Sequence, residues 1–253
     1  MDVMVDVRSL VRRFGPFVAV NDVTFGVARG EVVGFLGPNG AGKSTTMKMI
    51  TGFLTPTSGS IKVAGHDVAS DPIAAKRQIG YLPEGAPAYP DMTPRQFLSF
   101  IASIRRLDDA TRRRRMDLVV DRTNIGDVLD QPIDTLSKGF KRRVGLAQAI
   151  LHDPPVLILD EPTDGLDPNQ KHEVRELIHS MAAEKAIIIS THILEEVEAI
   201  CTRAMIIARG RLVAEGWPLE NGWQLGDLHV PPGQLDAAFR DITQGRAAPG
   251  VAA

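Results

Sequence analysis

The sequence contains a single cysteine, Cys201, among 253 residues. One cysteine cannot form a disulfide within the chain or supply a Cys-x-x-Cys metal pair, which is typical of a protein from a reducing compartment. Because Cys201 follows the apolar Ile200, we interpret its thiol as a small buried group rather than a reactive one.

An excess of charge of either sign is absent too. The 29 lysines and arginines nearly balance 31 aspartates and glutamates, for a net charge of −2, so bulk electrostatics provide no attraction to nucleic acid or to an anionic membrane. The run Arg112–Arg115 has no aromatic residues between its arginines, and we interpret it as the solvated face of a helix that Thr111 can cap. We therefore expect no nucleic-acid partner.

Long apolar runs are also missing. No stretch approaches the roughly 20 apolar residues that span a bilayer, and the longest runs, Val156–Leu159 and Ala186–Ile189, have the length of buried strands. The first residues, Met1–Asp6, include acidic side chains where a secretory signal would be basic. We expect the chain to be soluble by itself and to act at a membrane only through a partner.

The chain has strand patterns near both ends and a helical pattern between them. Residues 3–8 alternate apolar and polar side chains, and a turn is predicted at Phe14–Pro16. The apolar run Glu31–Leu36 leads into a glycine-rich segment, which a helix follows. Residues 84–151 are mainly helical in pattern, with apolar side chains at helical spacing at Phe97, Phe100, Ile101 and Ile104.

After Pro154 and Pro155 the alternation of strands and helices resumes. We predict strands at 156–159 and 186–189, a helix that begins at Asp167–Pro168, and a hairpin that turns at Arg209–Gly210. The pattern indicates an α/β domain over residues 1–220 with a helical insertion. A short C-terminal extension, 221–253, carries one amphipathic segment, and we expect it to be disordered around residues 246–250.

The most specific motif is the segment Gly37-Pro38-Asn39-Gly40-Ala41-Gly42-Lys43-Ser44, which matches GxxxxGK[ST] between a predicted strand and a predicted helix. Its glycines let the backbone wrap closely around a phosphate, and the helix that follows directs its positive end at the same group. Lys43 can reach the β- and γ-phosphates, and the Ser44 hydroxyl is a hard oxygen ligand for Mg²⁺. We assign Thr45 to the same nucleotide-binding segment. The strand and helix context disfavours a glycine-rich turn that binds nothing.

A second acidic motif completes the expected site. The apolar run Val156–Leu159 carries Asp160 and Glu161 to the carboxyl end of a strand, where α/β sheets bind ligands. Asp160 can then belong to the Mg²⁺ shell, and Glu161 can accept a proton from an attacking water. Such a run could also be a strand with a solvated end, but the phosphate-binding motif makes the catalytic interpretation the stronger one.

Between these two motifs, Leu136-Ser137-Lys138-Gly139-Phe140 resembles the signature motif of ABC ATPases, usually LSGGQ. The resemblance extends over almost the whole chain: Phe14 matches the aromatic A-loop, Asp164–Asp167 the D-loop, and Ser190–His192 the switch histidine. It implies a P-loop NTPase fold of the ABC type. An antiparallel β subdomain would lie on the N-terminal side, and a helical subdomain between the Walker A segment (37–44) and the Walker B segment (156–161).

The resemblance also implies roles for individual residues. Phe14 would stack on adenine, and His192 would contact the γ-phosphate and position the attacking water beside Lys43 and Glu161. Ser137 and Gly139 would close on the γ-phosphate of ATP bound to a neighbouring subunit. The implied assembly is a head-to-tail dimer with a second ATP-binding subunit, for which a second copy of this chain is the first expectation, although a related chain is also possible. The implied cofactors are ATP and Mg²⁺.

The sequence Ile79–Glu84, IGYLPE, followed by Tyr89–Thr93, is similar to the ATP-binding subunits of ABC-2 type exporters, including gliding-motility and drug-resistance relatives. Glu84 replaces the glutamine of many family members; it can ligate Mg²⁺, or it can only cap a surface turn. Tyr89 can contact a partner or its own domain.

The resemblance implies a separate integral membrane permease and a peripheral location at the cytoplasmic face of the cell membrane. The alternative is a non-transport ABC ATPase that acts in cofactor or macromolecular assembly. The single P-loop and the lack of long heptad repeats disfavour the two-domain translation factors and the chromosome clamps of this family.

Overall fold

A twisted antiparallel sheet is built from the N-terminal part of the chain. The computed structural model describes residues 2–246, and its first sheet has the order β2-β1-β4-β5, with strands β1 (Val3–Phe14), β2 (Phe17–Ala28), β4 (Ser58–Val63) and β5 (His66–Asp67). The two-residue turn between β1 and β2 pairs Phe14 with Phe17. The predicted strand pattern of residues 3–8 and the turn after Phe14 are confirmed.

A larger sheet forms the centre of the molecule, in the order β12-β11-β10-β9-β3-β8-β7-β6. Its strands are β3 (Val32–Leu36), β6 (Ile79–Leu82), β7 (Val156–Asp160), β8 (Ala186–Thr191), β9 (Arg203–Ala208), β10 (Arg211–Leu219), β11 (Gly222–Leu225) and β12 (Leu228–Val230). The strands from β9 to β6 in this order are parallel, and β9 to β12 pair antiparallel. The central strands β3, β7 and β8 are fully buried and, apart from Asp160, Ser190 and Thr191 at their carboxyl ends, have no polar side chains, as expected of parallel strands covered on two sides.

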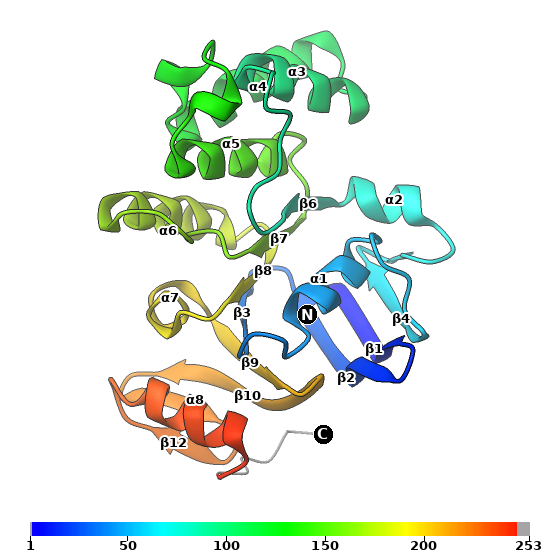
Figure 1. Ribbon diagram of the computed structural model, residues 1–253, viewed down its shortest axis with the longest axis vertical. Coiled ribbons are helices and arrows are strands. Elements are labelled where there is room, and N and C mark those ends of the chain that lie inside the picture. The colour runs from blue at the N-terminus through cyan, green and yellow to red at the C-terminus, as the bar shows by residue number, and fades with distance from the viewer. Residues whose placement is uncertain (1, 247–253) are drawn as a thin grey trace.

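Each face of the larger sheet has its own apolar core. Val33 and Phe35 of β3 point into one core, shared with α1 (Lys43–Ile50) and the antiparallel sheet, whereas Val32 and Leu36 point into the other. The second core is covered by α6 (Pro168–Ala182), α7 (Leu194–Ile200) and α8 (Leu235–Gln244). Figure 1 shows the four-stranded sheet and α1 on one side, with α6, α7 and α8 on the other. The loop before α1 thus follows a strand that is held between two packed layers.

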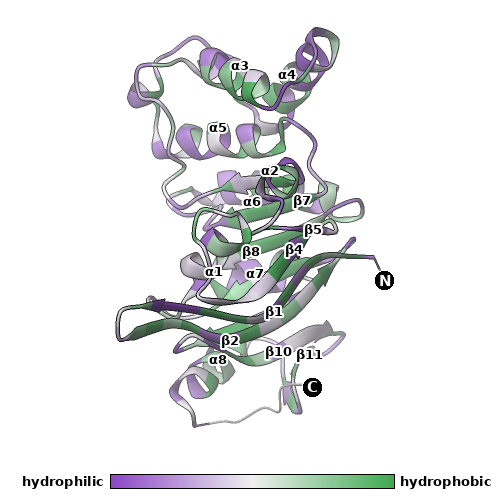
Figure 2. Ribbon diagram, turned by 90° about the vertical axis from the view of Figure 1, so that its right-hand side faces the viewer, coloured by the Kyte–Doolittle hydropathy of each residue, from purple (hydrophilic) through white to green (hydrophobic). Residues whose placement is uncertain are grey.

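The helical insertion lies at one end of the molecule (Figure 1). It contains α3 (Pro94–Ile104), α4 (Asp109–Thr123) and α5 (Lys138–Ile150), with short 3₁₀ turns at Gly126–Val128 and Ile133–Thr135; a short helix, α2 (Pro72–Arg77), precedes β6. Figure 2 shows β7 and β8 as hydrophobic strands in the interior, whereas α4 is largely hydrophilic. The expected arrangement of an antiparallel subdomain and a helical insertion between the two phosphate-site motifs is confirmed.

Two details of the insertion differ from the prediction. Asp108, not Thr111, caps α4, because its carboxylate accepts hydrogen bonds from the N–H groups of Ala110 and Thr111. The arginine run is not wholly solvated either: the Arg115 side chain is only 12% exposed. Its guanidinium donates to the carbonyl oxygens of Ile150 and Leu151, where it satisfies acceptors at the end of α5 that the helix leaves unpaired.

The segment beyond residue 220 continues the main sheet. Strand β11 pairs antiparallel with β10, and β12 pairs antiparallel with β11. Helix α8 packs on β9 and β10 and buries Leu235, Ala238 and Ile242. Trp223 on β11 is 4% exposed and belongs to the same core. These strands, of four and three residues, were not predicted, and the expected disorder at 246–250 falls on residues outside the described part except for Arg246. No helix within residues 2–246 has the length and apolar character needed to cross a bilayer.

Candidate nucleotide site

A cavity of about 410 Å³ brings most of the predicted site residues together. Four separate segments contribute to it: the β1–β2 hairpin, the loop between β3 and α1, the chain after β6, and the end of β7. Its lining residues are Phe14, Phe17, Ala19, Pro38, Asn39, Gly40, Ala41, Gly42, Lys43, Ser44, Thr45, Glu84 and Glu161. The glycine-rich loop therefore faces an aromatic hairpin on one side and two carboxylates on the other.

The loop between β3 and α1 needs glycine for two different reasons. Gly42 has a φ of 109°, and a Cβ there would lie 2.6 Å from the carbonyl oxygen of Ala19, so a larger residue would displace the loop from β2. Gly40 also has a positive φ, 77°, but its missing Cβ would meet no atom within 4 Å. That open space beside the backbone, next to the N-terminus of α1, is a concavity of the kind that binds phosphate.

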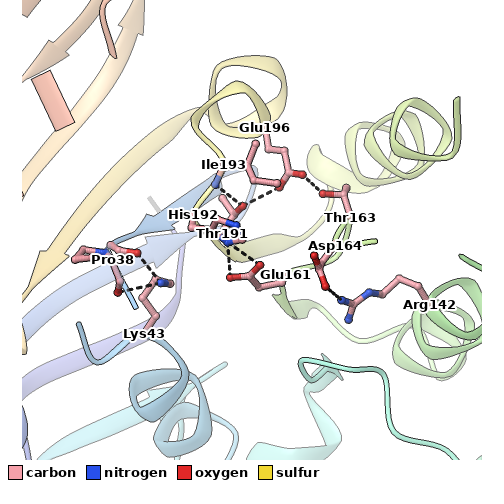
Figure 3. Close-up of polar contacts among 11 residues, drawn as sticks. Pro38, Lys43, Arg142, Glu161, Thr163, Asp164, Thr191, His192, Ile193 and Glu196 are labelled. Carbon is pink, nitrogen blue, oxygen red and sulfur yellow. Dashed lines mark hydrogen bonds and ion pairs between the residues drawn. The ribbon is translucent and has the colours of Figure 1, made fainter. Parts of the chain in front are cut away.

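Lys43 is held inside this loop. Its ammonium donates to the carbonyl oxygen of Gly37 at 2.6 Å and to that of Pro38 at 3.3 Å, as Figure 3 shows. Burial lowers the pKa of Lys43, and the nearby carboxylates of Glu161, Asp160 and Glu84 partly oppose this effect. A desolvated cation bonded only to neutral carbonyls is poised to bind an anion, because phosphate oxygens would form stronger, charge-assisted hydrogen bonds.

Asp160 provides a test of whether the site fits a divalent cation. Burial raises the pKa of Asp160, and the neighbouring carboxylates of Glu84 and Glu161 add to that effect. Its Oδ1 atom is buried and has no hydrogen-bond partner among the described residues, an arrangement that is costly unless another group binds there. The hydroxyls of Ser190 and, to a smaller extent, Ser44 lie close enough to the carboxylate to oppose this rise in its pKa. A buried, unpaired carboxylate oxygen beside a hydroxyl fits Mg²⁺.

The other donors at this position are few. Glu84 is exposed on the cavity wall, and no group of three His, Cys, Asp or Glu side chains gathers at metal-binding distances within residues 2–246. Mg²⁺ commonly uses only one or two carboxylates and takes its remaining ligands from phosphate and water. Ser44, Asp160 and Glu84 could therefore hold Mg²⁺ together with a nucleotide.

Glu161 lines the cavity, and His192, which does not line it, contacts the Glu161 carboxylate. The Nδ1 atom of His192 lies 2.9 Å from Oε1 and 2.8 Å from Oε2 of Glu161 (Figure 3). Glu161 has a φ of 54°, in the left-handed region that is rare for residues other than glycine. Strained backbone of this kind persists where surrounding contacts impose it, often at functional sites. The pair joins a carboxylate that can accept a proton to an imidazole that can donate one.

The signature residues lie elsewhere. Ser137 caps α5 by accepting a hydrogen bond from the N–H of Phe140 at 3.3 Å. Gly139 faces α6, where a Cβ would lie 2.6 Å from Oε1 of Gln170. Neither residue lines the nucleotide cavity, so the single chain does not bring them to its own phosphate loop.

Four residues at or beside the site were not predicted: Phe17, Arg142, Thr163 and Glu196. Phe17 could have been found, because the two-residue turn after Phe14 places both rings on one face of the hairpin. Arg142 is 4% exposed and lies between the carbonyl of Pro83 and the carboxylate of Asp164, at 3.5 and 3.8 Å. Buried charges such as Arg142 and Glu196 have no sequence pattern that distinguishes them from surface charges.

Comparison with known proteins places these features in one family. The sequence profile described as "ABC transporter" matches residues 20–164. The Nod factor export ATP-binding protein I of Burkholderia orbicola (strain AU 1054) is 39% identical over 215 residues, which cover 85% of this chain and 71% of that protein. The probable multidrug ABC transporter ATP-binding protein YbhF of Escherichia coli (strain K12) is 34% identical over 239 residues, 94% of this chain. The match spans only 41% of the length of YbhF.

A solved structure supports the same assignment. The structure titled "Structure of ATP binding subunit of ABC transporter" superposes with a TM-score of 0.80 at 35% sequence identity, and the match covers 85% of this chain and 90% of that one. The shared fold thus extends over most of the chain.

Proposed function

The chain belongs to the ABC transporter family, and from this premise we propose that it hydrolyses Mg-ATP to drive a separate integral membrane permease. The observation that carries the proposal is the cavity itself. The phosphate loop, Glu84 and Glu161 line it, and two residues behind this lining complete the arrangement: the buried Asp160, which precedes Glu161, and His192, which contacts Glu161. Binding alone would not require Glu161 at this position, whereas hydrolysis requires a proton acceptor near the γ-phosphate.

The proposed hydrolysis uses this chain's residues in distinct roles. Lys43 exchanges its two carbonyl partners for oxygens of the β- and γ-phosphates, and the adenine stacks against Phe14. Glu161 accepts a proton from the attacking water. Nδ1–H of His192 donates to Glu161, and when the ring is doubly protonated Nε2–H on its other side can donate to an oxygen of the γ-phosphate. Mg²⁺, held by Ser44 and Asp160 with Glu84 nearby, would neutralise charge on the phosphates.

We further propose that two ATP-binding subunits act as a head-to-tail dimer. Ser137 and Gly139 are at the start of α5, away from the chain's own cavity, yet a helix start whose capping hydroxyl can still donate its hydrogen is suited to a phosphate. A second subunit could present this surface to the γ-phosphate that Lys43 binds. Dimer closure then depends on bound ATP, so ATP binding and hydrolysis can close and open the dimer and thereby drive the permease.

A groove outside the nucleotide cavity supports the proposal that the chain binds a permease. It has a volume of about 400 Å³ and lies between the end of α1, α2 and α3. Phe53, Ile73 and Ile104 on its wall are 74%, 68% and 59% exposed, an unusual concentration of exposed apolar side chains for a surface without a partner. The groove also contains four basic residues, Lys76, Arg77, Arg105 and Arg106.

Tyr89 packs on α3, a helix that contributes to the groove, although Tyr89 itself does not line it. Its ring packs edge-on against two rings of α3, with centroid distances of 5.6 Å to Phe100 and 6.3 Å to Phe97. Tyr89 is nevertheless 53% exposed. Tyr89 therefore packs on its own domain with one side and leaves the other available to a partner. It lies five residues after Glu84, so the same loop reaches from the nucleotide cavity to this surface.

The names of the relatives, Nod factor export and multidrug ABC transporter, favour an exporter, which agrees with the resemblance to ABC-2 type subunits. The proposed location is the cytoplasmic face of the membrane that holds the permease. The test is co-purification of the tagged chain from detergent extracts, followed by identification of the captured protein. Capture of a multi-span membrane protein supports the transporter; capture of soluble assembly factors alone would favour the non-transport alternative.

Substitutions in the groove and at Tyr89 test whether this side of the molecule contacts the permease. Phe53→Ala and Tyr89→Ala are expected to reduce capture of the permease while the ATPase of the isolated chain stays near the parental rate. Leu219→Ala, at a side chain that is 48% exposed on β10, is the matched control away from the groove. Equal capture by all three variants would remove the groove from the interface.

A further inference from the structure

Glu196 is a buried acid outside the nucleotide cavity. It lies on α7 and is 1% exposed, and burial raises the pKa of its carboxyl group. A buried carboxylate is costly unless hydrogen bonds satisfy its oxygens. Two threonines do so: Thr163 Oγ1 donates to Oε1, and Thr191 Oγ1 donates to Oε2 at 2.9 Å (Figure 3).

The two threonines belong to the two loops that carry the catalytic pair. Thr191 is the last residue of β8 and immediately precedes His192; its Oγ1 also accepts a hydrogen bond from the N–H of Ile193 at 3.0 Å. The Thr191 hydroxyl therefore restrains the residues on both sides of His192. Thr163 is 1% exposed and lies two residues after Glu161 in the loop that follows β7.

Glu196 therefore connects the position of His192 to that of Glu161. A second connection runs through the backbone, because the N–H of Glu161 donates to the carbonyl of Ser190 at 2.8 Å. Beyond these strand ends the loops are joined by the His192–Glu161 contact itself and, through Thr163 and Thr191, by the carboxylate of Glu196. The left-handed backbone at Glu161 needs such restraint, since the conformation is unfavourable by itself.

We propose that Glu196 is a positioning residue for ATP hydrolysis: its carboxylate holds the loops after β7 and β8 so that His192 and Glu161 stay in contact. The inference rests on the proposed ATPase function. Glu196 does not line the nucleotide cavity, so its loss acts on the catalytic step and not on nucleotide affinity. The same link extends to Asp164, the residue after Thr163, which forms an ion pair with Arg142.

Two substitutions separate positioning from folding. Glu196→Gln replaces one acceptor oxygen by an amide donor. Thr163→Val keeps the shape of the side chain and removes only the hydrogen bond to the loop of Glu161. Glu198→Gln, an exposed residue on the same helix, is the matched control. Each full-length variant is first compared with the parent for its melting temperature, and Thr163→Val serves if Glu196→Gln does not fold.

The kinetic readout is the split between kcat and KM. We expect Glu196→Gln and Thr163→Val to bind a fluorescent ATP analogue with a Kd within about two-fold of the parent and to lower kcat by about tenfold or more, with KM little changed. The double variant should be no slower than the slower single variant, because both remove the same link. A kcat equal to that of Glu198→Gln in the folded variants would overturn the proposal.

A spectroscopic readout works without turnover and keeps this inference distinct from the proposed function. The chain has six histidines, so the ring resonance of His192 can be assigned by its loss in His192→Gln. It should shift in Glu196→Gln and Thr163→Val and stay in place in Glu198→Gln. An unmoved resonance would overturn the positioning role even in an active enzyme. If the His192 resonance shifts in these two variants as expected but the parental chain never hydrolyses ATP, only the proposed ATPase function is contradicted.

Discussion

The imidazole of His192 contacts the carboxylate of Glu161 although the two residues are 31 positions apart in the chain. The contact follows from the sheet: β7 and β8 are parallel neighbours in which Asp160 pairs with Ser190. Residues that come just after paired positions leave the sheet at the same edge, where ligands of α/β sheets bind. The phosphate loop leaves β3 at this edge too, since β3 pairs with β8.

The hairpin aromatics are expected to bind the base of ATP. The Arg12 guanidinium lies over the Phe14 ring, 4.5 Å from its centre, and restrains it, whereas Phe17 has no such support. Phe14→Ala should weaken ATP binding by about 1–3 kcal/mol, Phe17→Ala by less, and Phe14→Trp should be tolerated. Titration with a fluorescent ATP analogue measures the affinity, with Phe53→Ala as an exposed aromatic control outside the cavity. If Phe14→Ala binds the ATP analogue with unchanged affinity, Phe14 does not contact the base and has only a structural role.

Glu84 is expected to act through Mg²⁺. Glu84→Gln retains an oxygen ligand and should keep substantial ATPase activity, whereas Glu84→Ala should need a higher Mg²⁺ concentration for half-maximal activity. The measurement is ATPase rate against Mg²⁺ concentration. Asp91→Ala, an exposed acid in the same loop that does not line the cavity, is the control. If all three variants titrate like the parent, Glu84 is only a surface-turn residue.

His152 should make the fold sensitive to acid. Burial and the nearby Arg105 lower its pKa to about 3, and its Nε2–H donates to the carbonyl of Ile79 at 3.1 Å. An unfolded histidine binds a proton below about pH 6.5, whereas the folded one stays neutral, so this contribution to stability is complete above pH 6.5 and is lost as the pH falls toward 3. The loss between about pH 7.5 and about pH 5 is roughly 2 kcal/mol.

The variant His152→Gln keeps a donor for Ile79 and cannot titrate. Its melting temperature should therefore fall less between these two pH values than that of the parent, by about 4–8 °C. The exposed His179→Gln is the control and should behave like the parent. A parental pH dependence in His152→Gln would show that other groups control the acid response.

The sequence predicted the parts of the site that depend on local pattern. A strand, a fixed glycine spacing and a helix start are enough to place Lys43 and Ser44, and an apolar run that ends in two acids places Asp160 and Glu161. Phe14 and Glu84 were predicted only through the resemblance to a family, and the structure brings both to the same cavity.

Features that depend on tertiary contacts were not predictable in the same way. Thr111 and Asp108 are both good helix caps, and only the packed helix shows that Asp108 is used. Arg115 belongs to a run of arginines that predicts a solvated helix face, yet its guanidinium caps the C-terminal end of α5. Glu196 is one of several acids on α7, and burial between two loops gives it a role that its neighbours lack. The short strand β11 is defined by its pairing with β10, and β12 by its pairing with β11, and not by their own composition.

The ATPase activity of Glu161→Gln tests the proposed reaction most directly. The purified chain is expected to hydrolyse ATP in the presence of Mg²⁺. Glu161→Gln should bind Mg-ATP as tightly as the parent, lose turnover by about 10²-fold or more, and sediment as an ATP-dependent dimer, because only proton acceptance is removed. Glu198→Gln should match the parent in each assay. Near-parental turnover by Glu161→Gln would contradict its role as the base, and absence of any ATP hydrolysis by the parental chain would contradict the proposed function itself.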